Sequence, residues 1–206
     1  MKRSIQNRQN HKLGYTLRNI LFSIFILGFY GCSSYQVDKD IQNPEAAQPC
    51  LGSTSLPENM ATHFEPINDM QLLNEALGTP NKGKLCHGQV YKSKESSNIT
   101  LFRAWNSTNP NSKFGKWWAF QKPAGKVSTY RSEYEICYQW SPLDKLVSCT
   151  LKPNIKVVVG TGQSAECSEY LIYPVSEKQQ IYIEDASSSL INCSVFEGEF
   201  SWKRVQ

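Results

Sequence analysis

The sequence predicts an α+β fold, in which a single disulfide-stapled domain combines a mainly antiparallel sheet with two short helices. Segments rich in β-branched and aromatic residues outnumber those with helical periodicity. Most of these segments are joined by connections too short for the crossover helices that parallel strands require. Six cysteines follow Cys32, and an even number of them suits disulfide pairing in an oxidising compartment.

Two stretches of the chain have helical periodicity. In residues 68–77, Asp69 or its neighbour Asn68 can cap a helix, apolar side chains recur at helical spacing, and Gly78 stands where a C-terminal cap belongs. In residues 128–140, aromatic side chains fall on one face and Pro142 follows. We expect one short helix in each stretch.

Strands are expected in six segments, which are bounded mostly by Pro, Gly or Asn. They are residues 99–105, 146–151, 155–159, 171–173, 180–184 and 194–202. Lys152-Pro153-Asn154 is a typical turn sequence between the second and the third.

The N-terminus has the pattern of an export signal. Five basic residues and no acidic one precede the apolar run 20–30. This run is shorter than the about 20 apolar residues that a membrane-spanning helix needs, and a charged segment before a short apolar one is typical of a signal peptide. We expect residues 1–31 to be removed. An uncleaved N-terminal anchor is the alternative.

The end of the apolar run, Phe29-Tyr30-Gly31-Cys32, resembles the lipobox of bacterial lipoproteins. The resemblance implies that Cys32 becomes a lipidated N-terminus that attaches the protein to a membrane of the cell envelope. Phe29 and Tyr30 depart from the family, which usually has Leu and a small residue there, so an ordinary signal peptide cleaved nearby stays open. Ser33 is not the aspartate of inner-membrane retention, which favours the outer membrane, facing the periplasm or the exterior.

Removal of the predicted signal peptide changes the net charge of the protein, and with it the class of partner that the protein can bind. The formal charge of +4 falls to −1, because the five basic residues leave. Without a basic patch on the folded part, the sequence excludes a nucleic-acid-binding function. Residues 32–59 are polar and lack a hydrophobic period, so they are expected to form the lipidated N-terminus and a flexible tether. Residues 60–206 are expected to form the globular domain.

The six later cysteines are candidates for three disulfides: Cys50, Cys86, Cys137, Cys149, Cys167 and Cys193. Sequence alone leaves their 15 possible pairings open. A metal site is not expected, because the chain has no C-x-x-C pair and three His.

The sequence does not support two common functional motifs, a dinucleotide-binding fingerprint and a serine hydrolase elbow. Gly160, Gly162 and Ala165 have the spacing of a dinucleotide-binding fingerprint, but the mechanism needs a helix to begin at that turn. Cys167 and Pro174 follow too closely for one, so a Gly-rich turn is the expectation. There is no G-x-S-x-G elbow that would indicate a serine hydrolase.

A third pattern extends from the predicted strand 99–105 to the predicted strand 180–184. Arg103, the segment Gly115-Lys116-Trp117-Trp118 and Gln180 follow one another in this order. The order resembles the ADP-ribosyltransferase-like domains of some bacterial toxins. It implies such a fold for residues 99–184.

The resemblance also implies roles in binding and transfer from NAD. Arg103 would hold the pyrophosphate, because a guanidinium binds phosphate oxygens bidentately. Trp117 and Trp118 would pack against nicotinamide, and Gln180 with Glu184 would complete the catalytic site. Tyr182 stands where the family has a glutamate, and Glu184 lies about 7 Å further along the strand.

Two functions therefore compete. The favoured one is a non-catalytic envelope lipoprotein without a cofactor, whose domain presents Trp105, Trp117 and Trp118 to an envelope protein or a glycan. The alternative is an NAD-dependent ADP-ribosyltransferase-like enzyme or toxin domain that uses Arg103 with Gln180 or Glu184.

Overall fold

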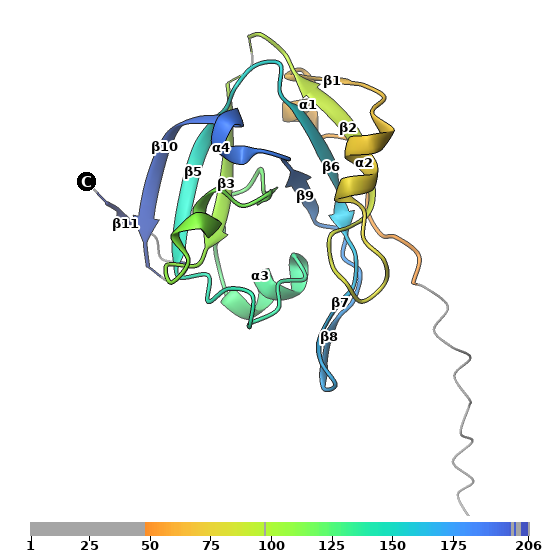
Figure 1. Ribbon diagram of the computed structural model, residues 1–206, viewed down its shortest axis with the longest axis vertical. Helices are drawn as coiled ribbons and strands as arrows, with labels where there is room; N and C mark the ends of the chain where they lie inside the picture. The colour runs from red at the N-terminus through yellow and green to blue at the C-terminus, as the bar shows by residue number, and fades with distance from the viewer. Residues whose placement is uncertain (1–47, 97, 199, 201–202, 206) are drawn as a thin grey trace, which may run out of the picture. The chain divides into compact units, whose positions relative to one another are not determined.

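The computed structural model describes residues 48–206, apart from 97, 199, 201, 202 and 206. It consists of two antiparallel sheets of five and four strands and a separate two-stranded hairpin (Figure 1). All strand pairs within these sheets are antiparallel, as the short connections predict.

The five-stranded sheet has the order β1-β2-β6-β9-β4. Its members are β1 (Phe64–Pro66), β2 (Leu85–Ser93), β6 (Lys156–Gly162), β9 (Gln179–Tyr182) and β4 (Trp117–Trp118). The four-stranded sheet has the order β11-β10-β5-β3 and contains β11 (Lys203–Arg204), β10 (Leu190–Glu197), β5 (Lys145–Leu151) and β3 (Ile99–Trp105). The hairpin consists of β7 (Ala165–Ser168) and β8 (Leu171–Tyr173).

Strand β6 is buried on both faces, which explains its continuous run of valines. Val157 and Val159 point into the main core, which both large sheets share. Val158, on the opposite face, joins a second core cluster with Leu72 and Ala76 of α2 (Met70–Ala76). Successive side chains of a strand point to opposite faces. Helix α2 therefore packs against Val158, on the face of β6 opposite to Val157 and Val159.

Four short α-helices occur in the described residues, where the sequence predicts two. They are α1 (Glu58–Ala61), α2, α3 (Val127–Glu133) and α4 (Ala186–Ser189), and a 3₁₀ turn covers Pro110–Phe114. The predicted cap of α2 is present, because the Asp69 side chain accepts a hydrogen bond from Leu72 N at 3.1 Å. Gly78 does not end this helix, since Leu77 is already extended.

Helix α3 is much shorter than the predicted helix 128–140. It ends at Glu133, and Glu135 takes a left-handed backbone conformation with φ of 47°. Ile136 N then donates to Arg131 O, which closes the helix end. The aromatic face of the predicted helix is therefore divided between α3 and the turn that follows it.

The predicted strands differ from the observed ones mainly at their ends. Strands β3 and β8 have the predicted bounds, whereas β9 ends at Tyr182 and leaves Glu184 outside it. Of the predicted strand 194–202, residues 194–197 belong to β10, which begins at Leu190 and pairs with β11. Strand β2 was not predicted.

The six cysteines form three disulfides, as predicted. The pairs are Cys50–Cys86, Cys137–Cys167 and Cys149–Cys193, with Cα atoms 5.5, 5.3 and 4.1 Å apart. The first bond attaches the start of the described chain to β2. The second joins the turn after α3 to β7, and the third joins β5 to β10.

The predicted tether is too long at its C-terminal end. Leu51 O accepts a hydrogen bond from Thr161 Oγ1 at 2.6 Å, and Thr54 O accepts one from the Tyr91 hydroxyl at 3.0 Å. Leu56 packs against the main core. Residues 51–56 therefore belong to the domain.

The predicted signal peptide and Cys32 lie outside the described residues. Within the described residues, no helix has the length and apolarity to cross a bilayer.

Candidate functional site

A cavity of about 190 Å³ lies beside the edge of the five-stranded sheet, where β4 and β9 meet α3 and the turn after it. Five of the 13 residues that line it are aromatic: Trp117, Trp118, Tyr130, Tyr134 and Trp140. Three ionisable or amide side chains that border it matter most for its chemistry: Arg103, Glu135 and Gln180. Ligand sites are typically apolar cavities with a few placed polar groups, which is the composition found here.

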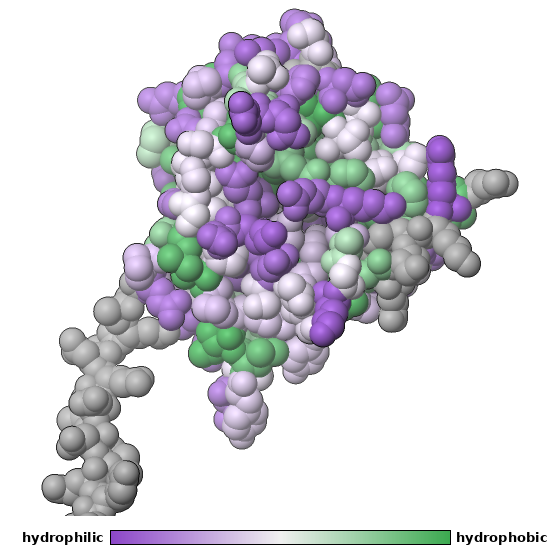
Figure 2. Space-filling view, turned by 180° about the vertical axis from the view of Figure 1, so that it is seen from behind, coloured by the Kyte–Doolittle hydropathy of each residue, from purple (hydrophilic) through white to green (hydrophobic). Residues whose placement is uncertain are grey.

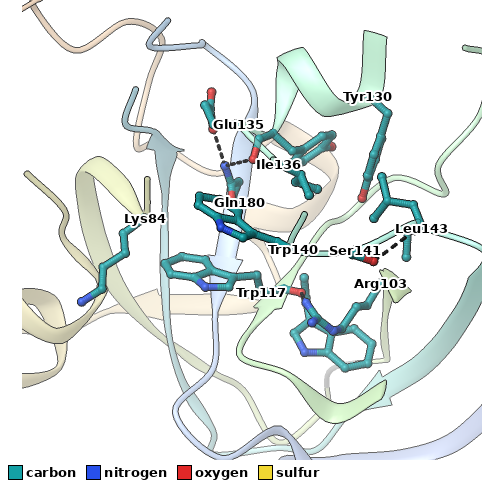
Figure 3. Close-up of a pocket in the computed structure, with 13 residues that line it drawn as sticks. Lys84, Arg103, Trp117, Tyr130, Glu135, Ile136, Trp140, Ser141, Leu143 and Gln180 are labelled. Atoms are coloured by element: carbon teal, nitrogen blue, oxygen red, sulfur yellow. Dashed lines mark hydrogen bonds between the residues drawn. The ribbon is translucent and has the colours of Figure 1, made fainter. Parts of the chain in front are cut away.

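The polar end of the cavity is formed by Glu135 and Gln180 (Figure 3). Gln180 Nε2 donates to Glu135 Oε2 at 2.8 Å and more weakly to Tyr134 O at 3.4 Å. Both N–H groups of the Gln180 amide are thus used within the protein. Its carbonyl oxygen accepts no hydrogen bond from the described residues, which leaves it available as an acceptor.

Glu135 is the most unusual ionisable group of the site. The side chain is 2% exposed, and Oε1 is buried without a hydrogen-bond partner in the described part of the chain. Burial raises the pKa of Glu135 from its ordinary value of 4.5 to about 8, although the Ser176 hydroxyl and the Gln180 amide lower it in part. The carboxyl is therefore mainly protonated at neutral pH.

Gly162 on β6 makes room for this carboxyl. A Cβ atom at this position would lie 1.6 Å from Glu135 Oε2. Since any other residue would displace Glu135, the glycine and the buried acid are structurally coupled.

Arg103 reaches the cavity from β3 with its charge already engaged by backbone carbonyls. Its Nε donates to Ser112 O at 2.8 Å and its Nη1 to Trp117 O at 2.7 Å. Burial lowers the pKa of Arg103 to about 10, so it stays protonated at neutral pH. The residue holds the 3₁₀ turn and β4 in place, whatever else it binds.

The turn after α3 is fixed at both ends. Arg131 donates to the carbonyls of Ile136 at 3.3 Å and Ser141 at 2.6 Å, and the Cys137–Cys167 disulfide fastens the turn to β7. Trp140 at its end lines the cavity and is 51% exposed. In Figure 3 the indoles of Trp117 and Trp140 are seen between the Glu135–Gln180 pair and Arg103.

The structure brings most of the predicted site residues to this one cavity. Arg103, Trp117, Trp118 and Gln180 all border it. Glu184 does not, because it lines a different cavity with Asp69 and Lys156.

The predicted aromatic surface requires a correction. Trp105 is 8% exposed and Trp118 is 2% exposed, so both belong to the core, where Trp118 Nε1 donates to Gly115 O. Of the three tryptophans, Trp117 alone is partly accessible. The aromatic residues that are truly exposed, Tyr138, Trp140 and Tyr170, were not predicted to be so.

The Gly-rich segment after β6 has no dinucleotide-binding geometry. Gly160 and Gly162 lie inside β6, and Ala165 begins β7, where the fingerprint needs a helix. Within the described residues, no group of three His, Cys, Asp or Glu side chains is arranged to hold a metal ion.

Sequence reasoning missed Glu135 as a site residue. The predicted helix 128–140 includes Glu135, whereas α3 ends at Glu133 and the side chain of Glu135 is buried in the turn that follows. A glutamate between Tyr134 and Ile136 is a weak signal of burial. Only the tertiary contact with Gly162 and Gln180 reveals its position.

Comparison of the chain with family models, with curated proteins and with solved structures finds no match.

Proposed function

We propose that the protein is an exported, lipid-anchored envelope protein whose domain binds a small ring-bearing polyol, such as one sugar unit of a glycan, in the cavity beside β4 and β9. The observation that carries this proposal is an acid and an amide side chain, Glu135 and Gln180, side by side in a cavity walled by tryptophan and tyrosine. The anchor at Cys32 is supported by the lipobox-like sequence.

The contacts favour a polyol over other small ligands. The Gln180 carbonyl is a free acceptor for a hydroxyl, and the protonated Glu135 carboxyl can both donate and accept. The flat faces of Trp117 and Trp140 suit the apolar face of a ring. At about 190 Å³ the cavity is smaller than the sites of drug-sized ligands, so it fits a single ring.

Isothermal titration calorimetry with a panel of monosaccharides tests the proposal. We expect saturable binding of at least one sugar to the oxidised domain, and about a tenfold loss of affinity in Gln180→Ala, since one hydrogen bond is removed. Gln71→Ala is the matched control, because Gln71 borders the other cavity and should bind like the wild type. Equal affinities in Gln180→Ala and the wild type would contradict the proposal.

The ADP-ribosyltransferase reading stands as a second candidate, because Arg103, Trp117 and Gln180 border one cavity. Against it, Glu184 borders a different one, and Arg103 is bound to two backbone carbonyls. The same calorimetry with NAD separates the two. Saturable NAD binding that is lost in Arg103→Ala would favour the transferase. Sugar binding without NAD binding would favour the non-catalytic binding domain.

A further inference from the structure

Exposed hydrophobic side chains gather at one end of the domain. Eight large hydrophobic residues are exposed in the described chain, and five of these lie at the end that carries the β7–β8 hairpin: Leu51, Tyr138, Trp140, Tyr170 and Ile172. Tyr170 at the hairpin tip is 88% exposed. Figure 2 shows hydrophobic residues directly above the projecting tip.

This end is rigidly built. The Cys137–Cys167 disulfide joins the turn that carries Tyr138 and Trp140 to the hairpin, and Gln139 Nε2 donates to Cys167 O at 2.7 Å. The hairpin projects beyond the sheets (Figure 1). These two bonds hold in place the backbone that carries the exposed aromatic residues.

The described chain also begins at this end. Cys50 is bonded to Cys86 at the start of β2, and Gln163, two residues before β7, contacts the Cys86 sulfur at 3.5 Å. A fully extended segment 33–47 would reach no more than about 55 Å. An anchor at Cys32 would thus be attached to the domain at this end, within about 55 Å of it.

We infer that the hairpin end rests on the membrane surface, with Tyr138, Trp140, Tyr170 and Ile172 at the level of the lipid headgroups. This inference rests on the proposed anchor at Cys32. Tyr and Trp are enriched at membrane interfaces, because their rings are apolar and their polar atoms stay wet. The hairpin carries Glu166 and Glu169, and Lys82 forms a β-bridge with Ala165 at its base, so charges of both signs occur here and the face suits zwitterionic lipid.

Hydrogen exchange on vesicles tests the inference. The lipidated full chain is placed on phosphatidylcholine–phosphatidylethanolamine vesicles, and the unlipidated Cys32→Ser protein in solution is the reference. We expect amide exchange in residues 168–173 to slow by about tenfold on the vesicles, because opening of the hairpin is hindered there. In Tyr170→Ser/Ile172→Ser this protection should be lost, although the protein still floats with the vesicles.

The control is Met70→Ser/Ile191→Ser, which removes two side chains that are similarly exposed elsewhere and should keep the protection. Unchanged exchange in floating wild-type protein would overturn the inference. Protection that appears only when envelope proteins are added would overturn it too, by assigning the face to a protein partner. Wild-type protein that does not float would refute the anchor itself, and the inference with it.

Discussion

Glu135 combines a left-handed backbone, almost complete burial and a hydrogen bond from Gln180. Burying a carboxyl costs free energy unless the group is protonated or well paired, and here one oxygen has no partner among the described residues. A fold rarely keeps such a residue for stability alone. Its position beside an aromatic cavity is the strongest indication of binding in this molecule.

The raised pKa of Glu135 makes stability depend on pH in a defined direction. Its folded-state value of about 8 lies above the ordinary value of 4.5, so the folded protein binds the proton more tightly than the unfolded chain. The associated stabilisation is complete below pH 4.5 and is lost as pH rises through 8. Between pH 5 and 9 the wild type should lose on the order of 4 kcal/mol of unfolding free energy relative to Glu135→Gln.

Urea unfolding of both proteins across this pH range measures the difference. Glu133→Gln is the control, since Glu133 is partly exposed and its carboxylate pairs with Lys178 at 3.6 Å. The control should follow the wild-type pH profile. Parallel profiles for the wild type and Glu135→Gln would mean that Glu135 is ionised in the folded protein.

Some candidate site residues could be assigned to their strands from the sequence alone. Arg103 and Gln180 were placed on strands, and they border one cavity. Glu184 could not be excluded from sequence, because its distance from Gln180 along a strand depends on where β9 ends. Ile183, the first residue after β9, donates its N–H to Lys116 O, and Glu184 follows outside the strand.

Among the elements, those with strong patterns were predictable and those shaped by contacts were not. Strand β3 is rich in β-branched and aromatic residues and was found with its bounds. Strand β2 contains Gly88 and several polar residues, and its pairing with β6 decides its conformation. Gly88 and Gly160 face each other there, so the two backbones approach closely; a Cβ on Gly160 would lie 1.9 Å from His87 O.

The Cys137–Cys167 disulfide should stabilise both the domain and its hairpin. The bond closes a loop with a sequence separation of 30, for which the chain-entropy model gives about 4 kcal/mol. We therefore expect Cys137→Ala/Cys167→Ala to lower the free energy of unfolding by about this amount. Amide exchange in β7 and β8 should also accelerate, because the turn no longer restrains them.

Cys50→Ala/Cys86→Ala is the matched control, with a sequence separation of 36 and a similar expected loss of stability. It should leave exchange in the β7–β8 hairpin unchanged once the global difference is subtracted. Equal acceleration in both variants would show that the hairpin has no special dependence on its own disulfide.

For the molecule as a whole, the fold class followed from the number of strand-like segments and the short connections. The presence of three disulfides followed from the even set of cysteines, but their pairing did not, since it depends on which strands become neighbours. The boundary of the domain was placed too late, because residues 51–56 look like a polar linker and are held by contacts with β2 and β6.

The proposed export and lipid anchor connect the three scales. Disulfides suit an oxidising compartment; in the cell envelope, the cavity would face envelope molecules and the exposed hairpin end would face the membrane. A protein retained in the cytoplasm would meet neither the redox conditions nor the proposed ligand and surface.

Intact-mass analysis of the protein recovered from cell envelopes tests this account most directly. It predicts a chain that begins at Cys32, carries the added mass of acyl groups there, and has no thiol that reacts with an alkylating agent before reduction. A protein that retains Met1, or one whose six later cysteines alkylate without reduction, would contradict it.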